Sequence, residues 1–149
     1  MGKNKSDNSD NKEILGCLNK IFQAEMGGIS RYLHYSFMIM GHNRIPIQKW
    51  LRSQANESMA HAIEIGEKIT SLGGHPTMVI EAVKETNVHS VDRLLKESLE
   101  FEEEGLELYE ELAALAVAKG DIALEELARG MVKAETEHCD EVRKMLRSK

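Results

Sequence analysis

The stretch LEELARGMVKAETEHCDEVRKM, residues 124–145, is the part of the sequence that most clearly indicates the fold. Its apolar residues recur every three or four positions, which is the spacing of one buried face of an α-helix. Those residues are Leu124, Leu127, Ala128, Met131, Val142 and Met145. Glu135 and His138 form an E-x-x-H pair on this face, so both side chains project the same way from adjacent turns. A carboxylate and an imidazole in that arrangement suit iron.

The composition of the whole chain is typical of an all-helical protein. The 149 residues fit one domain, and they are 42% hydrophobic and 30% charged with only two prolines. Glu, Leu, Ala, Lys and Met, all good helix formers, are abundant. We expect a flexible polar tail over residues 1–11 and a single all-α domain over residues 12–149.

Capping and turn signals divide that domain into four long helices. Asp10, with Glu13 three residues later, predicts the start of a first helix that ends near Met40. Pro46 opens a second helix that ends at Leu72 before two glycines. A third spans about 90–119, and Gly120 and Asp121 separate it from a fourth that runs to the end. The long link over 75–89 predicts a four-helix bundle with a crossover between the second and third helices.

Polar residues also interrupt the buried faces of the other three helices. Glu25 does so on the first helix, whose face is predicted to hold Leu18, Ile21, Phe22, Ile29, Tyr32 and Leu33. Glu102 does so on the third, within Leu95, Ser98, Leu99, Gly105, Leu106, Tyr109 and Leu112. His61 lies at the edge of the second face, formed by Leu51, Ala55, Ser58, Ala62, Ile65 and Ile69. At about 100° per residue, Ser58 points at the centre of this face, whereas Glu57 points roughly 110° away from that centre. The second partner of His61 on this helix is therefore either Ser58 or Glu57.

These polar residues indicate a metal site when they are taken together. Each one alone could be a structural residue with a satisfied hydrogen bond. All of them fall near the middle of their helices, however, so bundle packing brings them to a similar height. Several carboxylates in a dry core repel one another unless a cation compensates them. The sequence therefore predicts a bound metal ion in the core of the bundle.

Charge, hydropathy and cysteine usage exclude several other classes of protein. The net charge is −6 and the basic residues are interspersed with acidic ones, which excludes a nucleic-acid footprint. We find no signal peptide and no run approaching the roughly 18 apolar residues of a membrane span. Cys17 and Cys139 are too far apart to indicate a disulfide framework. We expect reduced thiols and a cytoplasmic protein without nucleic-acid or membrane partners.

The chain resembles the bacterioferritins from about Leu15 through Leu72 and again across the last two helices. The resemblance rests on Glu25, residues 31–34 (RYLH), residues 57–62 (ESMAHA), Glu102 and residues 135–138 (ETEH). It implies a ferritin-like fold and a di-iron centre within each subunit that oxidises Fe(II) with dioxygen or hydrogen peroxide for iron storage. It implies terminal ligands at Glu25 and Glu102, one iron on each of His61 and His138, and a bridge at Glu135. Tyr32 matches a tyrosine beside that centre.

Two features depart from the family pattern. Ser58 stands where the family has a second bridging Glu, so we expect a local bulge in the helix to turn Glu57 inward as a substitute ligand. Only eleven residues follow His138, whereas the family adds a short fifth helix at the four-fold axes of its cage. We therefore expect a ferritin-like bundle without that helix, and a homo-oligomer whose larger shell is open to test.

A haem site is the second cofactor that the resemblance implies. Met59 matches the methionine that ligates haem b, together with its symmetry mate, at the two-fold interface of the family. Methionine also commonly fills gaps in interfaces, so a packing role stays open. Met38, Trp50 and Met59 lie off the buried faces and predict an antiparallel dimer in either case.

The sequence thus predicts a ferroxidase that stores and detoxifies iron. Two alternatives remain. One is a di-iron enzyme of rubrerythrin type that reduces peroxide without a storage cage. The other is a purely structural helical bundle whose inward carboxylates pair with Arg or Lys.

Overall fold

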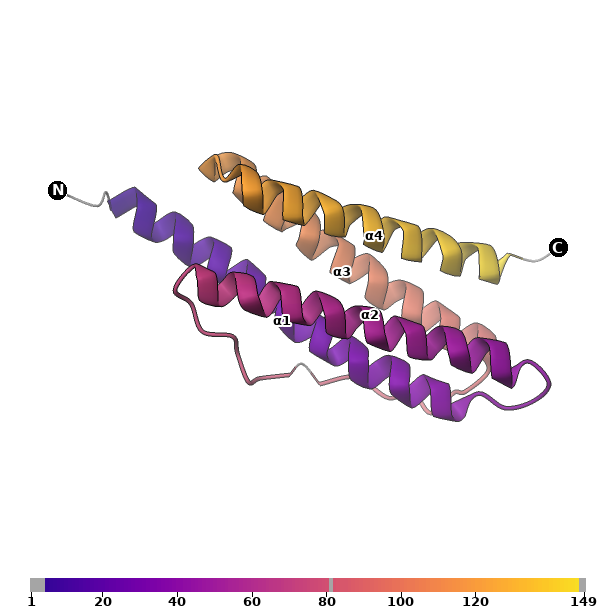
Figure 1. Cartoon of the computed structure of the whole chain (residues 1–149). Helices are drawn as coiled ribbons and strands as arrows, with labels where there is room; N and C mark the ends of the chain where they lie inside the picture. Colours follow the sequence, from indigo (N-terminus) through magenta and orange to yellow (C-terminus); the bar gives the residue numbers. More distant parts are fainter. Residues whose placement is uncertain (1–4, 81, 148–149) are drawn as a thin grey trace.

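Four long helices make up the fold in a computed structural model that describes residues 5–80 and 82–147. The helices are α1 (Lys5–Met38), α2 (Arg44–Ser71), α3 (Val91–Lys119) and α4 (Ile122–Leu146). α1 and α2 form one antiparallel pair, α3 and α4 form another, and the crossover between α2 and α3 runs along the outside of the bundle (Figure 1). The predicted all-α four-helix bundle with a crossover between the second and third helices is confirmed.

The helix ends carry the turn chemistry that the sequence indicates. Gly73, after α2, and Gly120, after α3, have φ values of 76° and 74°, which glycine adopts without steric cost. The Ser90 hydroxyl accepts a hydrogen bond from the backbone N–H of Arg93, and the Asp121 carboxylate accepts one from Leu124. Both are N-caps of the helices that follow.

The predicted start of the first helix is wrong, because α1 begins at Lys5 and no helix end lies at Asp10. Residues 5–10 are helical, so Asp10 lies inside α1 and does not cap its start. Residues 1–4 of the predicted tail lie outside the described residues, and the division into a tail and a domain stays a prediction.

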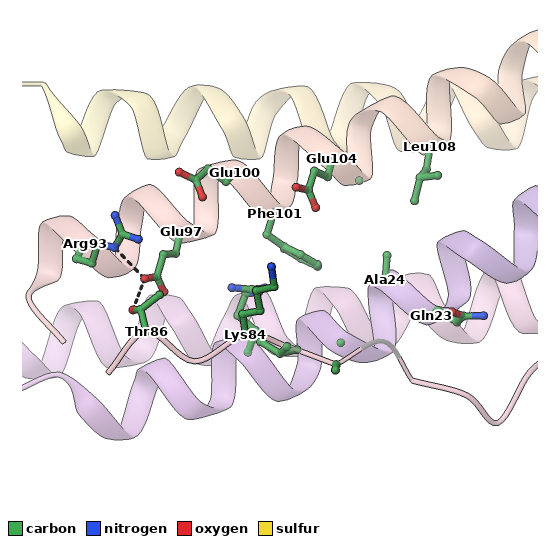
Figure 2. A pocket seen from close by; sticks show the side chains of 15 residues that line it. Gln23, Ala24, Lys84, Thr86, Arg93, Glu97, Glu100, Phe101, Glu104 and Leu108 are labelled. Atoms are coloured by element: carbon green, nitrogen blue, oxygen red, sulfur yellow. Dashed lines mark hydrogen bonds and ion pairs between the residues drawn. The ribbon is translucent and has the colours of Figure 1, made fainter. Parts of the chain in front are cut away.

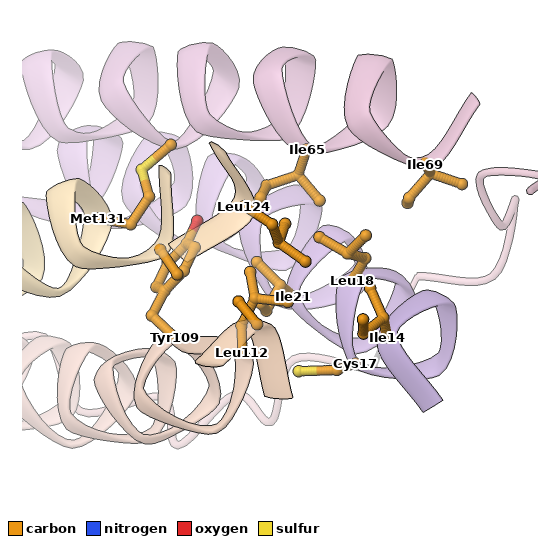
Figure 3. Close-up of a cluster of buried hydrophobic side chains, with 12 residues drawn as sticks. Ile14, Cys17, Leu18, Ile21, Ile65, Ile69, Tyr109, Leu112, Leu124 and Met131 are labelled. Atoms are coloured by element: carbon orange, nitrogen blue, oxygen red, sulfur yellow. The ribbon is translucent and has the colours of Figure 1, made fainter. Parts of the chain in front are cut away.

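Two apolar clusters fill the bundle at different heights. Figure 3 shows the larger one, which includes Ile14, Leu18, Ile65, Leu112 and Leu124. The smaller one consists of Tyr32, Tyr35, Ile39, Leu51, Ala55 and Leu94. Along every helix the residues predicted to bind metal fall between the two clusters or just beyond the larger one. A band of polar side chains therefore divides an otherwise apolar core.

Most of the predicted buried faces are confirmed, and Leu33 and Met145 are the exceptions. Both are 39% exposed. On α1 the buried face continues through Tyr32, Tyr35 and Ile39, which leaves Leu33 to one side. Met145 lies in the last turn of α4, beyond the packed part of the bundle.

The helices do not pack equally closely. α1 packs against α2 and against α3, and α3 packs against α4, whereas the backbones of α2 and α4 lie farther apart. Side chains must therefore bridge the space between α2 and α4. Over the residues that the structure describes, no helix has an apolar stretch long enough to cross a bilayer.

Candidate metal centre

Three carboxylates and two histidines meet in the core as two overlapping clusters. One consists of Glu25, His61 and Glu135, and the other of Glu102, Glu135 and His138. Within each cluster the nearest ligand atoms all lie within 4.8 Å of one another. Glu135 belongs to both clusters, so its two carboxylate oxygens face two neighbouring positions. Every helix of the bundle contributes at least one of these side chains.

His61 occupies the first cluster with its Nδ1 atom facing the carboxylates. That nitrogen lies 3.2 Å from Oε1 of Glu25 and 3.1 Å from Oε1 of Glu135. Burial by itself lowers the pKa of His61, but hydrogen bonds to Glu135 and Glu25 outweigh it and raise the pKa to about 10. The proton on Nδ1 of His61 thus lies between two carboxylates, at a position that a metal cation could occupy instead.

His138 has the corresponding orientation in the second cluster. Its Nδ1 atom lies 3.8 Å from Oε2 of Glu102 and 3.7 Å from Oε2 of Glu135. Its ring is stacked on that of His61, with the centroids 6.4 Å apart and an interplanar angle of 18°. Interactions with Glu102 and Glu135 raise the pKa of His138 to about 10. Both histidines therefore present the same ring nitrogen to the centre.

The two carboxylates of the second cluster titrate in opposite directions. Burial raises the pKa of Glu102 to about 8, so this side chain holds a proton at neutral pH. Burial acts the same way on Glu135, but hydrogen bonds to His138 and His61 outweigh it and hold the pKa of Glu135 below its usual range. The anionic Glu135 therefore depends on positive charge supplied by its neighbours.

Two tyrosines hold the outer carboxylates in a reciprocal arrangement. Tyr32 on α1 donates a hydrogen bond to Oε1 of Glu102 on α3. Tyr109 on α3 donates one of 2.6 Å to Oε1 of Glu25 on α1. Burial and the Glu25 carboxylate raise the pKa of Tyr109 well above its usual range, which keeps its hydroxyl a donor.

The sequence prediction included Tyr32 but treated Tyr109 only as a core residue. A signal was available, because each tyrosine follows the glutamate of its own helix by the same seven residues: Glu25 to Tyr32 and Glu102 to Tyr109. Seven residues are two helical turns, so glutamate and tyrosine share a face.

Ser58 and Glu57 do not behave as the sequence predicts. Ser58 is buried and faces α1, where a Cβ atom built on Gly28 would lie 2.8 Å from the Ser58 hydroxyl oxygen. Glu57 is half-exposed, and its Oε2 atom lies 2.5 Å from Nε2 of His138, the ring nitrogen opposite the clusters. Helix α2 is α-helical throughout Arg44–Ser71, so the predicted bulge is wrong. A regular helix suffices because the long Glu57 side chain reaches His138 from the rim.

The cofactor residue predicted for haem lies on the surface. Met59 is 47% exposed on α2, next to the buried Ser58 but pointing about 100° away from it around the helix. Met38 and Trp50, predicted to pack against a second subunit, are partly buried within the chain. The haem assignment at Met59 stays a prediction.

A small cavity lies beside the carboxylates of the centre. A space of about 10 Å³ is lined by Glu25, Glu102 and Glu135 on one side and by Phe101 and Gly105 on the other. Phe101 and Gly105 also line a groove of about 510 Å³ between α1, α3 and the crossover (Figure 2). The groove thus lies beside the centre, and Ala24 and Leu108 also line both hollows.

Comparisons with known proteins give one consistent result. Residues 16–148 match the family model described as a ferritin-like domain. A bacterioferritin of Desulfovibrio desulfuricans is 26% identical over 128 residues, which are 85% of this chain and 70% of that protein. A ferritin-like di-iron carboxylate protein of Bacillus anthracis superposes with a TM-score of 0.88 at 26% identity, over 99% of this chain and 100% of that one.

A second solved structure shares the fold at lower identity. The bacterioferritin of Rhodobacter capsulatus, described with a metal-free dinuclear site and a haem iron, superposes with a TM-score of 0.81 at 22% identity. The match covers 91% of this chain and 84% of that one.

Proposed function

Because the chain belongs to the ferritin-like family, we propose that its two clusters bind a pair of ferrous ions and that it acts as a ferroxidase. The observation that carries the proposal is the sharing of Glu135 by two clusters that each contain one histidine and a second carboxylate. Three carboxylates and two imidazoles are a donor set that iron accepts. Bound iron would supply the electrons that reduce dioxygen or hydrogen peroxide.

Each residue has a distinct part in this proposal. Glu135 would bridge the two positions, and Glu25 and Glu102 would complete one position each with His61 and His138. Tyr109 and Tyr32 hold the two outer carboxylates in orientation through their hydroxyl groups. Glu57 contacts Nε2 of His138 and would act as its positioning residue rather than as the missing bridge.

Protons on the two histidines would compensate the charge of the buried carboxylates before iron binds. His61 and His138, with pKa values of about 10, carry protons on the nitrogens that face the carboxylates. Incoming cations would replace these protons and the proton of Glu102. Iron binding should therefore release protons to solvent.

The substrates would reach the centre from the groove beside α1 and α3. Glu100 and Glu104 line that groove and could attract cations, and Lys84 and Arg93 limit the excess of negative charge (Figure 2). Phe101 and Gly105 form the boundary shared by the groove and the inner cavity. We propose that this boundary is the access route.

Storage and a cytoplasmic location form the wider part of the proposal. Two of the three proteins named above are bacterioferritins, which supports a homo-oligomeric shell that holds the ferric product. Both cysteines are free and buried, which fits a compartment that keeps thiols reduced. A haem at Met59 would lie at an interface between two copies of the chain.

An anaerobic Fe(II) titration followed by exposure to oxygen tests the function. The wild type should bind about two irons per chain and oxidise them faster than buffer does. Glu135→Gln should lose rapid oxidation while its circular dichroism stays helical, because the change removes the shared ligand and keeps the side-chain volume. Glu126→Gln, on the exposed side of α4, is the matched control. Unchanged oxidation kinetics in Glu135→Gln would overturn the assignment.

Iron binding, turnover with peroxide and the size of the oligomer separate the ferroxidase from the two alternative functions. A rubrerythrin-type enzyme would turn over with peroxide and a reductant while remaining a small oligomer without mineral. A purely structural bundle would bind no iron. The cluster carboxylates have tyrosine hydroxyls and histidine rings as partners, which favours a metal centre over a structural ion-pair network.

A further inference from the structure

His34, Glu85 and His89 converge on a second position, outside the core of the bundle. His34 lies on α1, whereas Glu85 and His89 lie on the crossover that precedes α3. One ligand atom from each residue lies within 4.8 Å of the other two. We propose that these three side chains form a binding site for a single divalent transition-metal ion, separate from the centre between the helices.

The distances among the three residues suit such an ion. Nε2 of His34 lies 3.1 Å from Oε1 of Glu85, and the rings of His34 and His89 are 6.0 Å apart at their centroids. Ligand atoms of a tetrahedral zinc at about 2.1 Å are separated by roughly 3.4 Å. Small side-chain rotations would therefore bring all three ligands onto one ion.

Unsatisfied nitrogen atoms give the second, independent observation. Nε2 of His34 and Nε2 of His89 are both buried atoms without a hydrogen-bond partner. The close approach of His34 to Glu85 does not have hydrogen-bond alignment, so it leaves the nitrogen unsatisfied. Buried polar atoms without partners are costly, and a bound cation would satisfy both nitrogens and the carboxylate together.

The space for the ion is already present. A cavity of about 180 Å³ has all three side chains in its lining. Glu97, the other carboxylate of this lining, is already engaged, because it accepts hydrogen bonds from Tyr35 and from Thr86 of the crossover. The cavity therefore offers room for an ion and for one or two water molecules.

Glu97 also fixes the part of the chain that carries the site. Its carboxylate accepts hydrogen bonds from Thr86 (2.5 Å), Arg93 (2.9 Å) and Tyr35 (2.7 Å), and Figure 2 shows the first two. Thr86 follows Glu85 directly, and His89 precedes Ser90, the N-cap of α3. Both crossover ligands thus lie next to anchored residues, which lowers the entropic cost of binding an ion.

The ligand set indicates which ions the site accepts. Two imidazoles and one carboxylate are the protein ligands of several catalytic zinc sites, and they also suit Fe²⁺, whereas Ca²⁺ and Mg²⁺ prefer sets made of oxygen atoms. Three protein ligands leave a fourth position open. Zn²⁺ is the suitable probe because it has no redox chemistry that would confuse the readout.

Zinc stoichiometry of the full chain tests the proposal. Wild type, His34→Gln, His89→Gln and the control His42→Gln would be equilibrated with Zn²⁺, desalted and analysed for bound metal. His42 is exposed and belongs to neither group of ligands. Each of the first two variants should lose about one equivalent relative to wild type and control. Glu135→Gln, which affects the core centre, should leave that equivalent in place.

Hydrogen exchange supplies a second measurement that does not depend on counting ions. Zn²⁺ should slow amide exchange over residues 85–89 in the wild type and in Glu135→Gln, because the ion ties the crossover to α1. It should have no effect there in His89→Gln. Two results would refute the site. One is an equal zinc stoichiometry in the wild type and in the His34→Gln, His89→Gln and His42→Gln variants. The other is equal protection of the crossover in His89→Gln and in the wild type.

Discussion

The contact between Glu57 and His138 shows how one half-exposed side chain can control a buried ligand. His138 points Nδ1 at the centre and Nε2 at Glu57, so the carboxylate fixes both the ring orientation and the tautomer once a metal is bound. We predict that Glu57→Gln lowers iron affinity by about tenfold without loss of helix content. Calorimetric titration with Fe(II) under nitrogen measures the effect. Glu64→Gln, an exposed change on the same helix, is the control, and an affinity equal to wild type in Glu57→Gln would contradict the positioning role.

Gly105 is the residue at which the proposed access route can be closed without disturbing the ligands. A Cβ atom at this position meets no other atom within 4 Å, and the groove that Gly105 lines has room for a larger side chain. We predict that Gly105→Leu slows Fe(II) oxidation several-fold while equilibrium iron binding stays close to wild type. Stopped-flow absorbance measures the rate. Gly130→Leu on α4, also with open space around its Cβ atom, should oxidise iron at the wild-type rate, and equal rates in both variants would place the route elsewhere.

At the scale of the helices, the close approach of α1 and α2 explains why Ser58 cannot simply be replaced by the family's glutamate. Gly28 and Ser58 meet where Phe101 also packs. A glutamate at position 58 would have to displace these neighbours and bury a further carboxylate. We predict that Ser58→Glu lowers the stability of the metal-free protein by about 1–3 kcal/mol. Urea unfolding measures this, with Ser58→Ala as the control, and an undiminished unfolding free energy would show that the interface can open.

The same helices show what sequence periodicity can and cannot predict. It identified the faces that carry Glu25, His61, Glu102, Glu135 and His138, because a side chain's direction follows from its position along a regular helix. It could not predict that Ser58 packs against Gly28, since that contact depends on the distance between two helices. It also missed the crossover ligands Glu85 and His89, because an irregular segment has no periodicity from which a side chain's neighbours can be inferred.

At the scale of the molecule, the protonated centre makes the stability of the metal-free protein depend on pH. The pKa values of His61 and His138 rise from 6.5 to about 10 on folding, so their stabilisation is complete below pH 6.5 and is lost as the pH approaches 10. The pKa of Glu102 rises from 4.5 to about 8 on folding, so its contribution to stability is also lost as the pH rises from 4.5 to about 8. We predict that Tm in EDTA falls steadily between about pH 6.5 and 9. A double variant His61→Gln/His138→Gln should flatten this slope, and a wild-type Tm that rises over the range would contradict the charge assignment.

Self-association is the property of the whole molecule on which storage and haem binding both depend. Met59 and Ile63 lie one turn apart on the outer side of α2 and are 47% and 61% exposed, so they form an apolar strip that is costly to leave in water. We predict a dimer through this strip, and Met59→Lys/Ile63→Lys should shift the mass in multi-angle light scattering to that of one chain. Val117→Lys, at an exposed apolar residue of α3, should leave the dimer intact.

If haem b binds at the same interface, Met59→Leu should abolish the haem absorption while preserving the dimer, because leucine keeps the apolar contact and lacks the sulfur ligand. A wild-type protein that remains a single chain at micromolar concentration would exclude the shared haem site and the storage shell, and would leave a di-iron enzyme as the function of the bundle.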